Sequence, residues 1–187
     1  MSSDNRAAAS LARTFEGGPV GFKAAVRAKI HALGMTQTRI EEPTGLSPAN
    51  KSTAEDLVKM AAAAATYPTI VEMTTDAKDV VNINGRGVGF RNTNRLVGAK
   101  GWDIGLSKTG YTEEAGRCLI MRITTAGKNA TLVMLNAKSS SSRVLDALNI
   151  RRFINSGESP VMAKAAVRKP SLRKRAKVAS NKKRRRR

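Results

Sequence analysis

The sequence predicts an α+β domain, because helical and strand patterns occupy different parts of the chain. Apolar residues recur at helical spacing through the first third, and short runs rich in β-branched residues follow from residue 79. A last amphipathic segment closes the domain. With 187 residues, 41% of them apolar, the chain has the makeup of one globular domain with an addition.

Helices are expected at residues 6–15, 19–33 and 52–67, where apolar side chains fall on one face of each segment. Glycines follow the first two segments and a proline follows the third, as is usual at helix ends. Ser52 and Glu55 have the spacing of a capping box at the start of the third helix.

Four strands are expected, at residues 79–83, 103–110, 117–125 and 130–136. Gly127 separates the last two, as a hairpin turn requires. The serine run 139–142 supplies an N-cap for a closing helix that continues to about residue 155.

The basic residues are concentrated at the C-terminal end. Thirteen of the 34 Lys and Arg residues lie between Lys164 and Arg187, and the rest of the chain has an excess of only 7 positive charges. We therefore expect one folded domain over residues 1–158 and a basic, disordered tail over residues 159–187. Nucleic-acid binding would depend on that tail and would be unspecific, because the tail has no aromatic residue for base stacking.

A single cysteine and a single histidine limit the chemistry. Cys118 excludes an internal disulfide, and its apolar neighbours predict a buried strand residue. His31 is expected to be an ordinary helix residue. No metal site is expected, because neither residue belongs to a cluster with metal-ligand spacing.

The N-terminal residues lack the basic start and apolar stretch of a signal peptide. No run approaches the roughly 20 apolar residues of a membrane span. As given, the chain is expected to stay in the cytoplasm, where it is made.

Two tripeptides indicate the function. Ser3-Asp4-Asn5 lies at the start of the first helix, and Lys108-Thr109-Gly110 lies at the end of a predicted strand. Each is weak alone. In this order and at this separation they resemble the second and third signatures of the serine penicillin-binding enzymes and class A β-lactamases.

Other segments within residues 2–157 are similar to the low-molecular-mass D-alanyl-D-alanine carboxypeptidases and endopeptidases of the penicillin-binding protein 7 type. They are Ala32-Leu33-Gly34-Met35, Glu42-Pro43-Thr44-Gly45-Leu46, Phe90-Arg91-Asn92-Thr93-Asn94 and residues 108–118. The Glu-x-x-Leu-Asn segment of class A β-lactamases is absent between the two tripeptides, which favours the peptidase. The resemblance implies a partial β-lactamase/transpeptidase-like domain with its third signature on an edge strand.

The family chemistry also requires a serine three residues before a lysine on one helix, so that nucleophile and base lie side by side. In relatives that motif precedes the second signature, where this sequence has only two residues. We therefore expect an N-terminally truncated chain that lacks the nucleophile and is inactive alone. Ser171 with Lys174, and Ser180 with Lys183, match the spacing, but they lie in the basic tail and are interpreted as coincidence.

The resemblance implies catalytic roles for three residues. Ser3 would relay a proton to the leaving amine, Asn5 would orient the substrate backbone, and Lys108 would supply positive potential near the substrate carboxylate. Alternation along Ile104, Leu106 and Lys108 predicts that the lysine ends an inward strand face.

The resemblance also implies substrate-binding roles at the strand end. The Thr109 hydroxyl would donate a hydrogen bond to the substrate carboxylate, and the Tyr111 N–H would be one oxyanion-hole donor, with Gly110 between them.

The implied activity is serine-type hydrolysis of D-alanine-containing muropeptides through an acyl-enzyme, without a cofactor or metal. The implied partners are peptidoglycan and, for the intact parent enzyme, β-lactam antibiotics, and the implied compartment is the periplasm. Carboxypeptidase and endopeptidase action both stay open.

Two other hypotheses stay open: a binding protein whose basic tail holds nucleic acid or an anionic envelope polymer, and a decayed, inactive fragment. Such a fragment would lack N-terminal strands, and its exposed edge would favour aggregation. Locally, Ser3 with Asn5 also fits a helix N-cap, and Lys108 fits a surface lysine. Asn92 and Asn94 are expected to make loop hydrogen bonds rather than substrate contacts.

Overall fold

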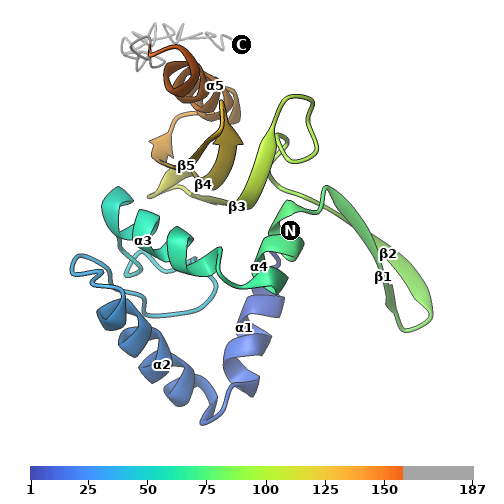
Figure 1. The fold of residues 1–187 in the computed structure, drawn as a ribbon. Helices are drawn as coiled ribbons and strands as arrows, with labels where there is room; N and C mark the ends of the chain where they lie inside the picture. Colours follow the sequence, from blue (N-terminus) through green and yellow to red (C-terminus); the bar gives the residue numbers. More distant parts are fainter. Residues whose placement is uncertain (158–187) are drawn as a thin grey trace, which may run out of the picture.

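The computed structural model describes residues 1–157, which form a helical half and an antiparallel sheet (Figure 1). The strand order is β3-β4-β5, in which β3 is Asp103–Thr112, β4 is Gly116–Thr125 and β5 is Lys128–Ala137. The predicted α+β class is confirmed. The strand that carries Lys108 is β3, at the sheet edge, as expected.

Helices cover both faces of the sheet. Helix α5 (Ser140–Ser156) lies on one face, and helices α3 (Ala54–Ala64) and α4 (Pro68–Thr75) lie on the other (Figure 1). Helices α1 (Asn5–Thr14) and α2 (Gly18–Ala32) pack on each other and complete the helical half. The candidate site lies where this half meets the sheet.

The N-cap of α3 is Thr53, whose side chain accepts a hydrogen bond from the Asp56 N–H at 3.3 Å. The predicted capping box of Ser52 with Glu55 is therefore wrong by one residue. The Ser52 hydroxyl pairs instead with the Thr38 hydroxyl at 2.7 Å, so it ties the preceding loop to the helix start.

Two elements, α4 and β2 (Arg86–Arg91), are absent from the sequence prediction. Pro68 begins α4, because the first helical turn tolerates its fixed φ and its missing N–H. Strand β2 pairs with the predicted strand β1 (Lys78–Ile83) across Asn84 and Gly85, whose φ values are 52 and 79. Positive φ at both positions is typical of a tight hairpin turn.

The core lies between the sheet and α5. Alternate residues of β4 point toward α5, and Leu119, Met121 and Ile123 are 1%, 0% and 2% exposed. Cys118 is only half-buried, so its predicted burial is wrong, because it precedes Leu119 and points to the other face. The serine run 139–142 supplies the N-cap of α5, as predicted, and Ser139 also forms a capping box with Ser142.

A β-bulge between Ile104 and Leu106 changes the face to which β3 side chains point. Ile104 pairs with Ile123 on the α5 face, whereas Leu106 pairs with Arg122 on the other face. The prediction that Ile104, Leu106 and Lys108 share one strand face is therefore wrong. Leu106 and Lys108 face the helical half, because they lie two residues apart beyond the bulge.

The loop at residues 41–50 is held by one carboxylate. Glu42 accepts hydrogen bonds from the hydroxyl and N–H of Thr44, from the Ser47 N–H and from the Asn50 side-chain amide. Burial of this carboxylate raises its pKa, but the hydrogen bonds outweigh burial and lower the pKa from 4.5 to about 2.

The stability that Glu42 contributes should depend on pH. Its folded-state pKa lies below the unfolded value, so the contribution is complete above pH 4.5 and is lost as the pH falls toward about 2. We expect the melting temperature of Glu42→Gln to fall less over this range than that of the wild type, as measured by circular dichroism. Glu16→Gln, at an exposed glutamate, should behave as the wild type does. A Glu42→Gln profile parallel to the wild type would contradict the assignment.

The described part of the chain also bears on the expectations about a membrane span, an exposed sheet edge and the domain boundary. No helix within residues 1–157 combines the length and apolar character needed to cross a membrane. In the same range the outer edge of β5 has no partner strand. Helix α5 is capped by Gly157, with φ 73, next to the predicted boundary at residue 158. The basic tail, with its expected binding of anionic polymers, lies outside the described residues.

Candidate functional site

The Ser3 hydroxyl and the Lys108 ammonium lie together although 105 residues separate them in the chain. Lys108 Nζ donates a hydrogen bond to Ser3 Oγ at 2.7 Å, and it also donates to the carbonyl oxygen of Thr109. Ser3 lies just before α1, and Lys108 lies on β3. The contact therefore joins the helical half to the edge of the sheet.

The turn before α1 leaves Ser3 free for this contact. Asp4 is the N-cap, and its carboxylate accepts hydrogen bonds from the N–H groups of Arg6 at 2.8 Å and Ala7 at 3.0 Å. The alternative in which Ser3 and Asn5 cap the helix is therefore wrong. Ser3 has φ 60, a left-handed conformation that is uncommon outside glycine and that often marks functional sites.

A cavity of about 410 Å³ lies beside the contact and contains the predicted substrate-binding residues. Ser3, Thr109, Gly110 and Tyr111 line it, together with basic residues of neighbouring elements. Thr109 Oγ1 donates a hydrogen bond to Thr93 Oγ1 at 2.7 Å. The end of β3 thus forms one wall, and the turn that carries Ser3 forms another.

Lys108 and Asn5 lie outside the lining of this cavity. The surrounding protein desolvates the Lys108 ammonium and lowers its pKa below the ordinary 10.5, although part of the side chain is exposed. An ammonium of lowered pKa, bonded to a hydroxyl, can exchange a proton through that hydroxyl. Asn5 begins α1 with an exposed side chain, and its amide has no hydrogen-bond partner within residues 1–157.

The cavity also contains an arginine that the sequence motifs do not single out. Arg143, in the first turn of α5, is 8% exposed, and its Nη1 donates to the Cys118 carbonyl oxygen at 3.0 Å. Its Nε is buried without a partner. Burial and then the charge of Arg117 lower the pKa of Arg143. A buried cation at a helix N-terminus is electrostatically unfavourable, so an anionic ligand group would be stabilised there.

Tyr111 lines the cavity and is also partly exposed to solvent. The ring is 50% exposed, and the Arg117 guanidinium lies 4.3 Å from its centroid. Tyr111 Oη donates to a carboxylate oxygen of Glu113, which raises the pKa of the phenol. Arg117 and Arg143 line the same cavity, where both cations favour an anion.

A family model described as D-alanyl-D-alanine carboxypeptidase matches residues 1–139. The chain belongs to this family.

Two D-alanyl-D-alanine endopeptidases are similar to this member of the carboxypeptidase family. The one from Pseudomonas aeruginosa is 45% identical over 168 residues, and the one from Escherichia coli is 44% identical over 168 residues. The matches cover 89% and 88% of this chain but 54% of each relative, so the chain spans about half of their length.

Solved structures of similar fold include a Streptomyces K15 DD-transpeptidase, with a TM-score of 0.72 and 26% identity over 79% of this chain and 61% of that one. Penicillin-binding protein D2 from Listeria monocytogenes in its cefotaxime-bound form has a TM-score of 0.68 and 28% identity, over 80% of this chain and 60% of that one. The expected partial transpeptidase-like fold is therefore confirmed.

The family asparagines of the loop after β2 hold the backbone. Asn92 Nδ2 donates to the carbonyl oxygens of Thr74 at 3.0 Å and Asp76 at 2.8 Å. Asn94 is 2% exposed, and its Nδ2 donates to Ser107 Oγ at 2.8 Å. The loop hydrogen bonding predicted for these residues is confirmed, and it fixes β3 one residue before Lys108.

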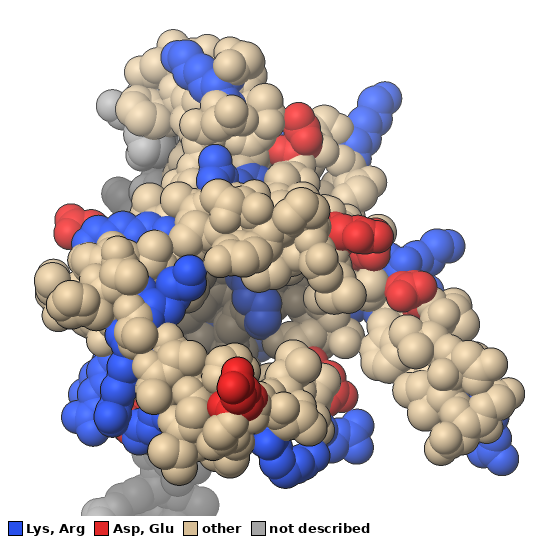
Figure 2. Space-filling model, turned by 60° about the horizontal axis from the view of Figure 1, so that its bottom comes forward, with Lys and Arg blue, Asp and Glu red and all other residues tan. Residues whose placement is uncertain are grey.

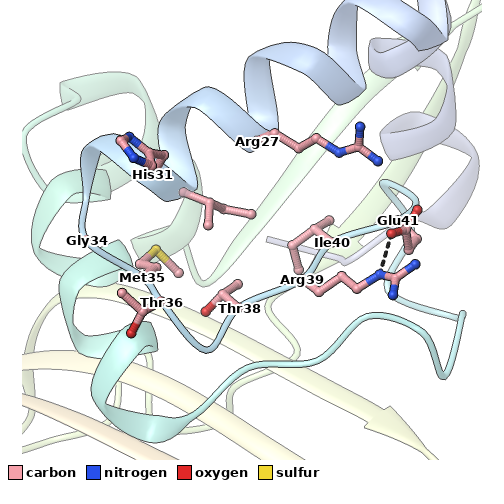
Figure 3. A pocket seen from close by; sticks show the side chains of 10 residues that line it. Arg27, His31, Gly34, Met35, Thr36, Thr38, Arg39, Ile40 and Glu41 are labelled. Atoms are coloured by element: carbon pink, nitrogen blue, oxygen red, sulfur yellow. Dashed lines mark hydrogen bonds and ion pairs between the residues drawn. The ribbon is translucent and has the colours of Figure 1, made fainter.

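A larger cavity of about 580 Å³ lies between α2 and residues 34–41 (Figure 3). Arg27 projects into it from α2, and Arg39 projects from the loop beside Glu41. Hydrogen bonds from Lys23 and Arg39 lower the pKa of Glu41 to about 2. This cavity shares no lining residue with the one beside Thr109, so it is separate from the predicted substrate-binding residues.

No group of three His, Cys, Asp or Glu side chains within residues 1–157 could hold a metal ion. His31 is exposed on α2, and Cys118 is a free thiol on β4. The groups that this part of the chain brings together are therefore hydroxyls and cations.

Proposed function

We propose that this chain supplies the proton-relay turn and the substrate-binding strand of a serine D-alanyl-D-alanine peptidase that acts on peptidoglycan. The hydrogen bond between Lys108 Nζ and Ser3 Oγ, at 2.7 Å, is the observation that carries the proposal. In this bond a hydroxyl and a cation of lowered pKa lie together at the edge of the cavity beside Thr109. Arg117 and Arg143 make the lining of that cavity basic.

The proposed reaction is acyl transfer to a serine. The serine Oγ attacks the carbonyl carbon of a D-alanine residue, its proton passes by way of the Ser3 hydroxyl to the leaving amine, and an ester forms as the peptide bond breaks. Water then cleaves the ester and restores the serine. We assign the nucleophile to a Ser-x-x-Lys segment, which residues 1–157 do not contain, and Asn5 to orientation of the substrate backbone.

The substrate carboxylate is assigned to the basic side of the cavity. The Thr109 hydroxyl and the Arg143 guanidinium both line this space, and Lys108 adds positive potential from the opposite face of β3. Gly110 leaves the strand edge open for the peptide, and the Tyr111 N–H is assigned to the oxyanion that forms during attack.

β-Lactams are the proposed inhibitors, because they acylate serines in sites of this kind, and the similar Listeria structure contains cefotaxime. Since peptidoglycan lies outside the cytoplasm, the proposed place of action is extracytoplasmic. Removal of a terminal D-alanine and cleavage of a cross-link use the same chemistry and differ in the group that leaves with the amine.

Labelling with a fluorescent penicillin tests this function. The chain alone should stay unlabelled. A joined protein, in which the portion of the P. aeruginosa relative that precedes the matched region is fused ahead of Ser2, should be labelled covalently. Changing the serine of its Ser-x-x-Lys segment to alanine is the matched control and should abolish the label. A folded joined protein that takes no label would refute the proposal, and labelling of the chain alone would place the nucleophile elsewhere.

Arg143→Gln should weaken carboxylate recognition in the joined protein. We expect the second-order rate constant for penicillin acylation to fall about tenfold to a hundredfold, mainly through weaker binding, because a charged hydrogen bond to the carboxylate is lost. The melting temperature should change little: the bond to the Cys118 carbonyl is lost, but so is a buried cation that has no acidic partner within residues 1–157 and whose Nε lacks a hydrogen bond. Arg152→Gln, at an exposed arginine of the same helix, is the control. An unchanged rate constant for Arg143→Gln would exclude it from the site.

A further inference from the structure

The ribbon formed by β1 and β2 stands apart from the rest of the molecule (Figure 1). Its two strands pair only with each other, and neither joins the three-stranded sheet. It projects beyond α4 with its Asn84-Gly85 turn at the free end. A two-stranded ribbon without a covering layer is marginally stable by itself, so contact with a partner would stabilise it.

Apolar side chains are exposed on both faces of the ribbon. Val81, Ile83 and Val88 share one face through the register Val81↔Val88 and Ile83↔Arg86, and they are 43%, 46% and 38% exposed. Val80 lies on the opposite face across from Gly89 and is 70% exposed. Exposed apolar surface of this extent marks an interaction site.

The charges on the ribbon are mostly positive. Lys78 lies opposite Arg91 in the strand register at the base of the ribbon, and Arg86 lies beside the turn at its tip. Asp79 is the one acidic residue of the two strands, and none of these three cations forms an ion pair within residues 1–157. Figure 2 shows the ribbon at lower right as a largely uncharged projection, with Lys or Arg at its ends and an Asp or Glu at its attached end.

These features favour one kind of partner. A protein surface or a further strand would cover one face or one edge of the ribbon and leave Val80 or Val81 in water. A bilayer interface surrounds an inserted hairpin, so it covers both faces, while arginines and lysines at its ends reach anionic headgroups. The three cations of the ribbon, with one acid among them, and the excess of 7 positive charges outside residues 164–187 complement such a surface.

We propose that the β1–β2 ribbon is a membrane-docking hairpin, which inserts Val80, Val81 and Ile83 into the interface of an anionic bilayer. This role goes beyond the proposed peptidase function and does not depend on it. Because the ribbon leaves the body next to the loop of Asn92 and Thr93, docking would hold the cavity beside Thr109 close to the membrane surface.

Vesicle sedimentation of the full chain tests the proposal. The vesicles contain equimolar phosphatidylglycerol and phosphatidylcholine, in about 0.1 M and about 1 M salt, where the screening length falls from about 10 Å to about 3 Å. At the high salt concentration the unspecific attraction of the basic residues is suppressed. We expect Val80→Ser/Ile83→Ser to partition at least about tenfold less than the wild type under that condition. Leu11→Ser is the matched control, at a residue of α1 that is 71% exposed, and should equal the wild type.

A second readout is independent of the strength of binding. With Ile83→Trp, the tryptophan emission should shift to the blue when vesicles are added, and with Leu11→Trp it should not. Equal partitioning of the wild type and the double variant at high salt would overturn the proposal. Ribbon-dependent sedimentation with purified peptidoglycan, in the absence of vesicle binding, would overturn it in favour of a cell-wall partner.

Discussion

We expect Lys108→Ala to lower the rate of penicillin acylation of the joined protein about a hundredfold to a thousandfold, the usual effect of losing one group that stabilises developing charge. The ammonium donates to Ser3 Oγ at 2.7 Å, so its removal leaves the hydroxyl that we propose as the proton relay without its partner. It also takes away positive potential beside Thr109, where the carboxylate is assigned. Burst labelling with fluorescent penicillin, followed over time, measures the rate.

The controls separate this role from a structural one. Lys100→Ala removes an exposed lysine from the loop before β3 and should leave acylation unchanged. Ser3→Ala keeps Lys108 but removes the relay, so it should lower acylation while leaving the melting temperature close to that of the wild type. If Lys108→Ala acylates at the wild-type rate, the contact between Ser3 and Lys108 has no part in the chemistry.

The two halves of this contact could be found from the sequence because each lies in a short motif with its own local structure. Ser3 precedes a helix whose cap Asp4 supplies, and Lys108 lies on an alternating strand. Their meeting could not be derived from either motif. It depends on how α4 packs against β3 and on where the turn before α1 lies, over a separation of 105 residues.

The face of the sheet to which Lys108 points was not predictable from alternation alone. A strict period of two places Ile104, Leu106 and Lys108 together, but the bulge before Leu106 moves the later residues to the other face. Gly105 lies at that position, and an isolated glycine in a strand is the signal that could have suggested the bulge.

Arg143 shows a different limit of sequence reasoning. An arginine that follows a run of serines at a helix start is typical of a solvated charge, and its burial arises only when α5 packs across β4 and reaches the Cys118 carbonyl. The sequence does contain one electrostatic indication. A cation in the first turn of a helix is disfavoured by the helix dipole, so Arg143 at this position suggests a functional role.

The largest stability effect is expected at Met121, which is fully buried at the centre of the core and pairs with Ser107 across β3 and β4. We expect Met121→Ala to lower the free energy of unfolding by about 2–5 kcal/mol, because the lost contacts leave a cavity that the sheet cannot fill. Denaturant titration followed by circular dichroism measures this loss. The effect should extend to the site, since Asn94 Nδ2 contacts both Met121 Sδ at 3.5 Å and Ser107 Oγ at 2.8 Å.

Two further variants show whether volume is the cause. Met121→Leu conserves side-chain size and should cost less than about 1.5 kcal/mol. Leu135→Ala removes an apolar residue that is 41% exposed on β5, so it should change stability far less than Met121→Ala. Equal losses at Met121 and Leu135 would mean that the sheet is not packed against α5 as described, and the wall that carries Thr109 and Arg143 would then lose its support.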